Sequence, residues 1–202
     1  MKTPFALPFA AVASAAALFL ALCVAARADD DTTVKRAGTY TTSTGASGSA
    51  ASTTTRGNGT VNRQGTWTNA AGGTGTWKSQ GAWNKATGTG TASGSATRPN
   101  GKTTTWQGTA QRTAPGVIKA QGTITHPNGS ESTYAATETK IAPGTWQRQA
   151  VITNPNGQKV DRDVTTTVAN GTVTRAATTT LPDGQAVTVN GTAAVTTAPA
   201  PH

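Results

Sequence analysis

A turn sequence that returns at nearly constant spacing is the feature that most constrains how this chain can fold. Six three-residue turns end in glycine: 43–45, 70–72, 99–101, 127–129, 155–157 and 182–184. The last four read Pro-Asn-Gly or Pro-Asp-Gly, and their glycines are 28, 28 and 27 residues apart. Proline suits the first position because its φ is already near −65°, and glycine takes the positive φ of the last position without strain. Each turn therefore predicts a β-hairpin.

Segments of constant length surround these turns. Ten residues precede each turn and twelve follow it, before a second turn of two to four residues starts the next unit. The second turns are 58–59, 85–88, 114–116, 142–144 and 170–171. Loop length varies while strand length does not, which is typical of antiparallel hairpins. We therefore predict an all-β chain, a twelve-stranded antiparallel up-and-down meander of six β-hairpin repeats of about 28 residues.

The apolar content excludes folds that depend on a large aliphatic core. Residues 29–202 contain one leucine, four isoleucines, eleven valines and no phenylalanine, which is 16 of 174 residues. So small a share cannot bury the apolar surface that offsets chain entropy in a leucine-rich helical domain or an α/β enzyme.

The three-residue loop also predicts which residues pair across each hairpin. Residues that flank the loop face the same side of the sheet, so His126 pairs with Ser130 and the rest of the register follows. This register places an aromatic ring opposite a glycine in five pairs: Tyr40–Gly48, Gly65–Trp77, Trp67–Gly75, Gly94–Trp106 and Gly122–Tyr134. A ring that covers the bare backbone of a glycine fixes the register of a sheet.

Alternation of side chains along the strands separates two faces. Face one carries most aliphatic and aromatic residues, with many glycines and alanines. It also has an arginine at the fourth position of the first strand in four of the six units: Arg36, Arg63, Arg148 and Arg175. Face two is mainly threonine, serine, glutamine and asparagine. Neither face is apolar enough to face lipid, and neither has the aromatic girdles of an outer-membrane barrel.

Three arrangements of this meander remain open. We favour a closed barrel with face one inside, because closure removes the unpaired edges of the sheet. The meander could instead stay open as a curved single sheet. A two-sheet solenoid, as in the repeats of curli-type amyloid subunits, is the third alternative. It would stack Arg36 on Arg63 in a narrow core, where unpaired charge is costly.

The N-terminal segment is typical of a cleaved signal peptide. Lys2 precedes an apolar run over 5–26, and Ala26-Arg27-Ala28 offers the small residues of a cleavage site. Cleavage would export the protein to the periplasm or extracellular space without a transmembrane span, and would remove Cys23, the one cysteine. The predicted parts are a signal peptide (1–28), a short N-terminal tail (29–32), one β-hairpin repeat domain (33–196) and a C-terminal tail (197–202).

The sequence pattern offers no constellation for catalysis or metal binding. Asp161 and Asp163 point from face two of one strand, and a carbohydrate-active enzyme would require them to lie in a cleft. His126 flanks a turn and is the one base that a nucleophilic serine could use. It has no histidine or cysteine neighbour for an ordinary metal site. We therefore expect no enzyme activity, no metal and no cofactor.

The basic charge offers a binding hypothesis. The formal charge is +9 for the whole chain, and fifteen basic against eight acidic residues leave +7 after residue 28. Candidate ligand-binding residues are the arginine row and four tryptophans: Arg36, Arg63, Arg148, Arg175, Trp67, Trp77, Trp106 and Trp146. Arginine and tryptophan together suit an acidic polysaccharide or the cell-envelope surface. The same arginines could instead line a wet barrel interior, out of reach of a long polymer.

These observations predict an exported, non-catalytic β-repeat protein that acts as an envelope or extracellular structural or binding module. Nucleic acid is not expected as a partner of an exported protein. A fibre-forming, curli-like subunit is the main alternative, and it would involve self-association. An ice-binding protein, suggested by the recurring Thr-x-Thr pairs, and a carbohydrate-active enzyme are further alternatives.

Overall fold

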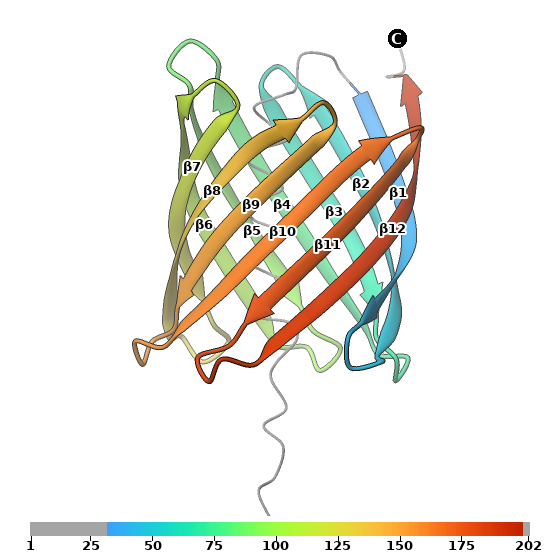
Figure 1. Cartoon of the computed structure of the whole chain (residues 1–202), viewed down its shortest axis with the longest axis vertical. Coiled ribbons are helices and arrows are strands. Elements are labelled where there is room, and N and C mark those ends of the chain that lie inside the picture. Colours follow the sequence, from blue (N-terminus) through green and yellow to red (C-terminus); the bar gives the residue numbers. More distant parts are fainter. Residues whose placement is uncertain (1–31, 200–202) are drawn as a thin grey trace, which may run out of the picture.

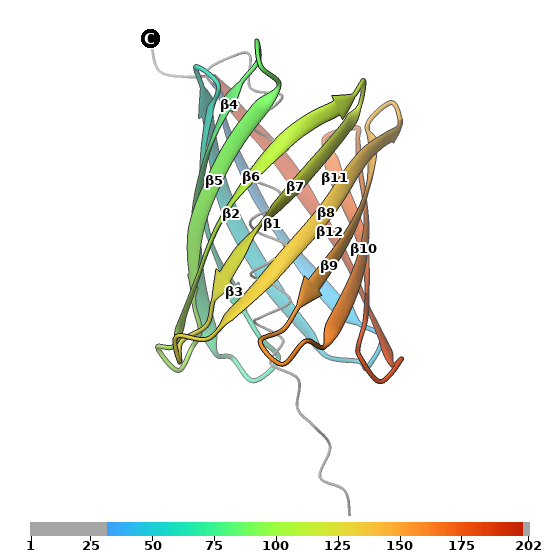
Figure 2. The same ribbon diagram turned by 90° about the vertical axis from the view of Figure 1, so that its left-hand side faces the viewer.

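The computed structural model describes residues 32–199, with side chains described over 33–194, as a closed barrel of twelve antiparallel strands (Figures 1 and 2). The strands are β1 (Thr32–Thr42), β2 (Ser47–Gly57), β3 (Thr60–Thr68), β4 (Thr74–Asn84), β5 (Thr89–Thr97), β6 (Thr103–Ala114), β7 (Val117–Thr125), β8 (Glu131–Ala142), β9 (Thr145–Thr153), β10 (Lys159–Ala169), β11 (Thr172–Thr180) and β12 (Ala186–Pro199). Each strand pairs with its neighbours in the sequence, and β1 pairs with β12. The predicted all-β closed meander is confirmed, and the open-sheet and solenoid alternatives are wrong.

The seam between β1 and β12 joins the two ends of the repeat array. Its register runs from Thr32 opposite Pro199 to Thr42 opposite Val189. The paired part of the chain is therefore slightly longer at both ends than the predicted domain, 33–196. Because β1 and β12 are paired, the described part of the chain presents no unpaired strand edge. The absence of such edges is the physical advantage that the sequence analysis attributes to a closed barrel.

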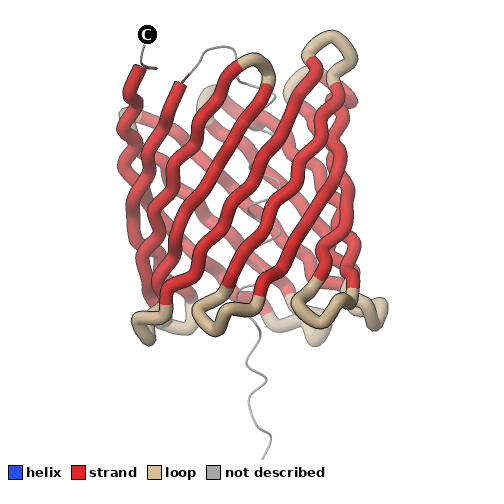
Figure 3. Tube along the Cα trace, turned by 180° about the vertical axis from the view of Figure 1, so that it is seen from behind, coloured by secondary structure: helices blue, strands red, loops and turns tan. Residues whose placement is uncertain are grey.

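The two rims of the barrel are built from different turns (Figure 3). At one rim all six three-residue loops end in a glycine whose φ lies between 76° and 83°. At the other rim Asn58 and Gly59 have φ of 49° and 71°, and Asn170 and Gly171 have 48° and 69°. Two successive positive φ values define a type I′ turn, whose twist matches that of the strands it joins. The turn chemistry predicted from the sequence is thus the one that the chain uses.

All five predicted glycine–aromatic pairs are confirmed by the strand register. In these pairs the ring occupies the space of a glycine side chain. A Cβ atom on Gly94 would lie 2.5 Å from Trp106 Cζ2, and one on Gly122 would lie 2.6 Å from Tyr134 Cε1. The structure adds a further pair, Trp83 opposite Gly90, which the sequence analysis missed. The rings lock the register because no side chain fits beneath them.

Face one lines the barrel interior, as predicted, and face two points to solvent. Val61, Ile124 and Tyr134 are among the buried inward residues. Many outward residues halfway along the strands are polar or charged and exposed; examples are Gln64, Lys78, Gln107, Gln149 and Asp163. Exposed alanines, such as Ala51 and Ala135, lie between them. Residues 32–199 contain no helix long and apolar enough to cross a membrane.

Candidate functional site

Six inward arginines lie on β9–β11 and β1–β3 and form what we call the basic wall: Arg36, Arg56, Arg63, Arg148, Arg162 and Arg175. Arg112 on β6 is also at an inward position, opposite Ile118, and its guanidinium lies 5.7 Å from the ring centroid of Trp83. Four arginines of the basic wall are the predicted row. Arg56 and Arg162 were missed, although alternation could have placed them, because Arg162 lies between the outward Asp161 and Asp163 on β10. Arg63, Arg148 and Arg162 are buried, with exposed fractions of 4%, 3% and 8%.

Barrel closure brings the basic wall together from opposite ends of the sequence. Arg36 and Arg63 lie on β1 and β3, whereas Arg148 and Arg175 lie on β9 and β11. The strand order β9-β10-β11-β12-β1-β2-β3 makes these segments one continuous arc of the cylinder. In an open sheet the two groups would lie at opposite edges. The site therefore exists because the barrel is closed.

The arginines perturb one another electrostatically. Burial, followed by the charges of Arg36, Arg56 and Arg148, lowers the pKa of Arg63 to about 9. Burial and the charge of Arg148 lower the pKa of Arg162 to about 10. Both values stay above neutral pH, so Arg63 and Arg162 remain charged there. The mutual effect shows that these cations are close enough to repel one another.

Negative charge inside the barrel is scarce. Among the described residues, Glu138 is the one carboxylate on an inward position, and it is 7% exposed. It lies directly opposite Arg148 in the register of β8 and β9. Its charge raises the pKa of Arg175, but burial and the charges of Arg148, Arg162 and Arg63 hold that pKa well below its usual value. One carboxylate therefore faces six guanidinium groups.

Several donors of the basic wall have no acceptor within the described structure. Arg63 donates from Nε to Thr54 Oγ1 at 3.1 Å, and its guanidinium lies 5.3 Å from the ring centroid of Trp77. Its Nη1 is buried without a hydrogen-bond partner, as are Arg36 Nε and Arg175 Nε and Nη2. Buried donors without acceptors are costly, so this wall favours a ligand, or water, that supplies oxygen acceptors.

The opposite side of the interior, on β4–β8, carries most of the large buried apolar side chains and is called here the apolar wall, although Ser79, Thr104, Ser132 and Glu138 are buried there too. Its buried residues include Trp83, Trp106, Ile118, Ile124, Tyr134 and Ala136. Ala92 and Ala120, which occupy the arginine position in the two middle units, belong to the same cluster. Trp67 and Trp77 pack against it, and Trp146 is an inward residue of β9. The eight predicted site residues thus all line the interior, four in the basic wall and four as aromatic residues.

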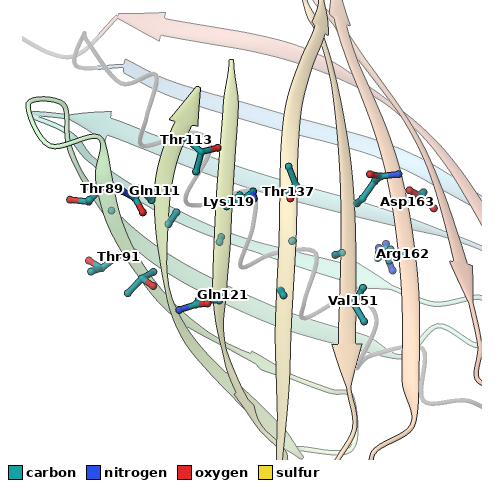
Figure 4. A pocket seen from close by; sticks show the side chains of 18 of the residues that line it. Thr89, Thr91, Gln111, Thr113, Lys119, Gln121, Thr137, Val151, Arg162 and Asp163 are labelled. Atoms are coloured by element: carbon teal, nitrogen blue, oxygen red, sulfur yellow. The ribbon is translucent and has the colours of Figure 1, made fainter. Parts of the chain in front are cut away.

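A groove of about 1110 Å³ is lined by β4–β10, mostly by outward side chains but also by inward ones such as Ala136 and Arg162 (Figure 4). Gln111, Lys119 and Thr137 line it as partners on three neighbouring strands. Asp161 and Asp163 also line it, and both are exposed. A hydrolytic carboxylate pair needs one carboxyl in an apolar setting that raises its pKa, and these two face water. The groove therefore resembles a solvated surface more than a catalytic cleft.

The side chain of His126 forms a hydrogen bond with a buried serine. Its Nε2 lies 2.7 Å from Oγ of Ser132, which is 1% exposed. Burial and the charge of Arg98 lower the pKa of His126. Within the described residues its side chain forms no other hydrogen bond, so no carboxylate completes a triad there. The same part of the chain also holds no group of three or more side chains suited to a metal ion.

Comparison with known proteins shows distant structural likeness alone. No family model matches the chain, and no curated protein matches its sequence. A mutant porin of Rhodopseudomonas blastica is 8% identical, with 82% of this chain and 99% of that chain covered and a TM-score of 0.47. Ail of Yersinia pestis, in complex with the heparin analogue sucrose octasulfate, is 8% identical over 83% of this chain and 99% of its own, with a TM-score of 0.26. Likeness at this level carries no functional inference.

Proposed function

We propose that this protein is an exported, non-catalytic β-barrel of the cell envelope or extracellular space that binds oxyanions in its interior. The observation that carries the proposal is the basic wall, in which six arginines face one carboxylate. Guanidinium groups form paired hydrogen bonds with carboxylate, sulfate and phosphate oxygens. A bound oxyanion would supply the acceptors that Arg63 and Arg175 lack and would offset the mutual repulsion of the wall.

The closed barrel changes the expected ligand. We expected an acidic polysaccharide along the arginine row of an open sheet, but the arginines are reached from the barrel ends. The ligand that fits this geometry is a short acidic saccharide, the end of a longer chain, or another compact oxyanion. We do not favour the fibre-forming alternative, because a closed barrel has no unpaired strand edge with which a second copy could pair.

The polar exterior supports a water-exposed location. Gln64, Lys78 and Gln107 lie outward near the middle of their strands and are exposed, where a lipid-facing strand carries apolar residues. After detergent phase separation of cell extracts, the mature protein is therefore expected in the aqueous phase. Recovery in the detergent phase, with residues 1–28 removed, would contradict this part of the proposal.

Titration calorimetry with a sulfated disaccharide tests the binding site. Replacing Arg63 and Arg175 together with glutamine should weaken binding roughly 100-fold, since each charge-assisted hydrogen bond contributes about 1.5–3 kcal/mol. The matched control replaces the outward Lys78 and Lys119 with glutamine, which changes the net charge equally. It should leave the affinity within about threefold, because exposed charges are screened by salt. Equal losses in the two variants would assign binding to general surface charge and refute an interior site.

A further inference from the structure

The basic wall and the apolar wall face the same interior from opposite sides. The basic wall occupies β9–β11 and β1–β3, and the apolar wall occupies β4–β8. The division follows the repeat: the fourth position of the first strand is Arg36, Arg63, Arg148 and Arg175 in the outer units, but alanine in the middle two. The basic wall thus holds most of the inward arginines and the apolar wall most of the large apolar side chains, although Val61, Ile152 and Val160 of the core cluster lie on strands of the basic wall.

A barrel of twelve strands is wider than a barrel whose interior is just filled by side chains. Barrel diameter grows about linearly with strand number, and about eight strands give an interior that side chains just fill. This barrel has twelve. Its apolar wall also carries small side chains: Ala110, Ala120 and Ala136 are consecutive partners across β6, β7 and β8. These short side chains occupy little of the interior.

The apolar wall also contains unused hydrogen-bond donors. The indole Nε1 atoms of Trp83 and Trp106 are buried without a partner in the described structure. With the free nitrogens of Arg36, Arg63 and Arg175, they make the described interior rich in donors, while its buried unpartnered oxygens include the hydroxyls of Ser79 and Thr104. A ligand with an oxygen-rich anionic group satisfies such donors, while an apolar body gains by covering the rings and alanines.

We propose that the interior binds amphipathic oxyanions, whose anionic head lies against the basic wall and whose apolar body lies against the apolar wall. Long-chain carboxylates and lipid phosphates have this chemistry. The inference rests on the proposed anion-binding function and narrows its ligand class. It also accounts for the arrangement of the walls, because a purely ionic ligand would make no use of β4–β8.

Tryptophan emission gives a direct readout, because the five tryptophans all occupy inward positions. We would titrate the mature protein with decanoate, acetate and decanol, and with the sulfated disaccharide as a purely ionic probe. Decanoate should bind at least tenfold more tightly than acetate or decanol and should change the emission. Replacing Arg63 and Arg175 with glutamine should weaken the binding of both decanoate and the disaccharide.

A neighbouring pair of alanines provides the matched variants for the apolar wall. Ala136→Gln places a polar side chain on the inward cluster, whereas Ala135→Gln places it on the exposed outer face of the same strand. The first should weaken decanoate binding at least fivefold while the disaccharide still binds, and the second should leave both unchanged. Circular dichroism would show that each variant keeps its sheet.

The outcomes separate the two proposals. If the disaccharide binds but decanoate binds no better than acetate, the amphipathic ligand is refuted and the anion site stands. If decanol binds as well as decanoate, and the arginine variant binds decanoate normally, the interior is an apolar site and the amphipathic anion is refuted. If neither anion binds, water satisfies the arginines and both proposals fail.

Discussion

At the residue scale, the glycine–aromatic pairs show how single side chains can specify a sheet with few aliphatic residues. Trp106 is 3% exposed and covers Gly94 on the neighbouring strand. Burying such a ring gives apolar area that the short Thr-rich strands cannot supply, and the fit of ring on bare backbone allows one register. The same residues therefore provide stability and specificity.

Replacing Trp106 with alanine should destabilise the barrel by roughly 1–3 kcal/mol because buried ring area is lost. Gly94→Ala should also destabilise it, since the new Cβ would lie 2.5 Å from Trp106 Cζ2. In the double variant the ring clash is gone and only a clash with the Lys78 carbonyl remains, so the two effects should not add. Urea unfolding of the four proteins measures this cycle, and strict additivity would show that the residues are not in contact.

The basic wall predicts a pH dependence of anion binding. Arg63 and Arg162 have pKa values lowered to about 9 and about 10 by burial and by neighbouring arginines. Both are charged below these values and lose charge as pH rises through them, so affinity for the sulfated disaccharide should be constant between pH 6 and 8. It should fall roughly tenfold for each neutralised arginine above that range.

Calorimetry at pH 7, 9 and 10.5 would measure the change. Arg63→Gln should show weaker binding at pH 7 and a smaller further fall at high pH, because one titrating group is missing. An affinity that stays constant up to pH 10.5 would contradict the lowered pKa values.

At the element scale, the hairpins depend on the conformation of their turns, and the three-residue loops differ from the type I′ turns at Asn58 and Asn170. The three-residue loops carry a glycine as the left-handed residue, whereas the type I′ turns also use an asparagine with positive φ, as at Asn58. Asparagine tolerates this conformation better than other residues with a side chain. Each hairpin is therefore a local unit whose turn can be tested alone.

Asn58→Ala should lower the free energy of unfolding by about 1 kcal/mol, the order of the cost of a left-handed conformation for a residue with a Cβ. Asn62→Ala is the control, because Asn62 is an exposed residue in the middle of β3. It should change stability by less than about 0.5 kcal/mol. Thermal and urea unfolding give both values, and equal effects would argue against the type I′ turn.

At the scale of the whole molecule, the function we propose depends on the seam. Thr39 on β1 and Thr192 on β12 are direct partners across it, although 153 positions separate them in the sequence. Closure unites the arginines of the first two and the last two hairpins in one wall and places the middle hairpins opposite. An open sheet of the same register would have neither an interior nor a two-sided site.

Cysteines at Thr39 and Thr192 should form a disulfide in the mature protein, because directly opposed residues of an antiparallel pair lie about 4.5–5.5 Å apart. Cysteines at Thr39 and Thr174 are the control, since Thr174 lies one strand further, opposite Thr192. That separation exceeds the roughly 7 Å that a disulfide can span. Thiol titration and mass spectrometry under oxidising conditions would detect the bond, and failure of the first pair to oxidise would mean an open seam.

The sequence by itself determined the features that depend on short-range chemistry. Turn glycines set the hairpins, the loops set the register, and side-chain alternation placed Arg36 and Trp106 on one face. The tertiary structure alone decided closure, and with it the approach of Arg63 to Arg148 and Arg175. The physical reason is that pairing and alternation are local, whereas closure depends on the tilt and stagger accumulated over all twelve strands. The sequence of a single repeat therefore does not specify whether the barrel closes.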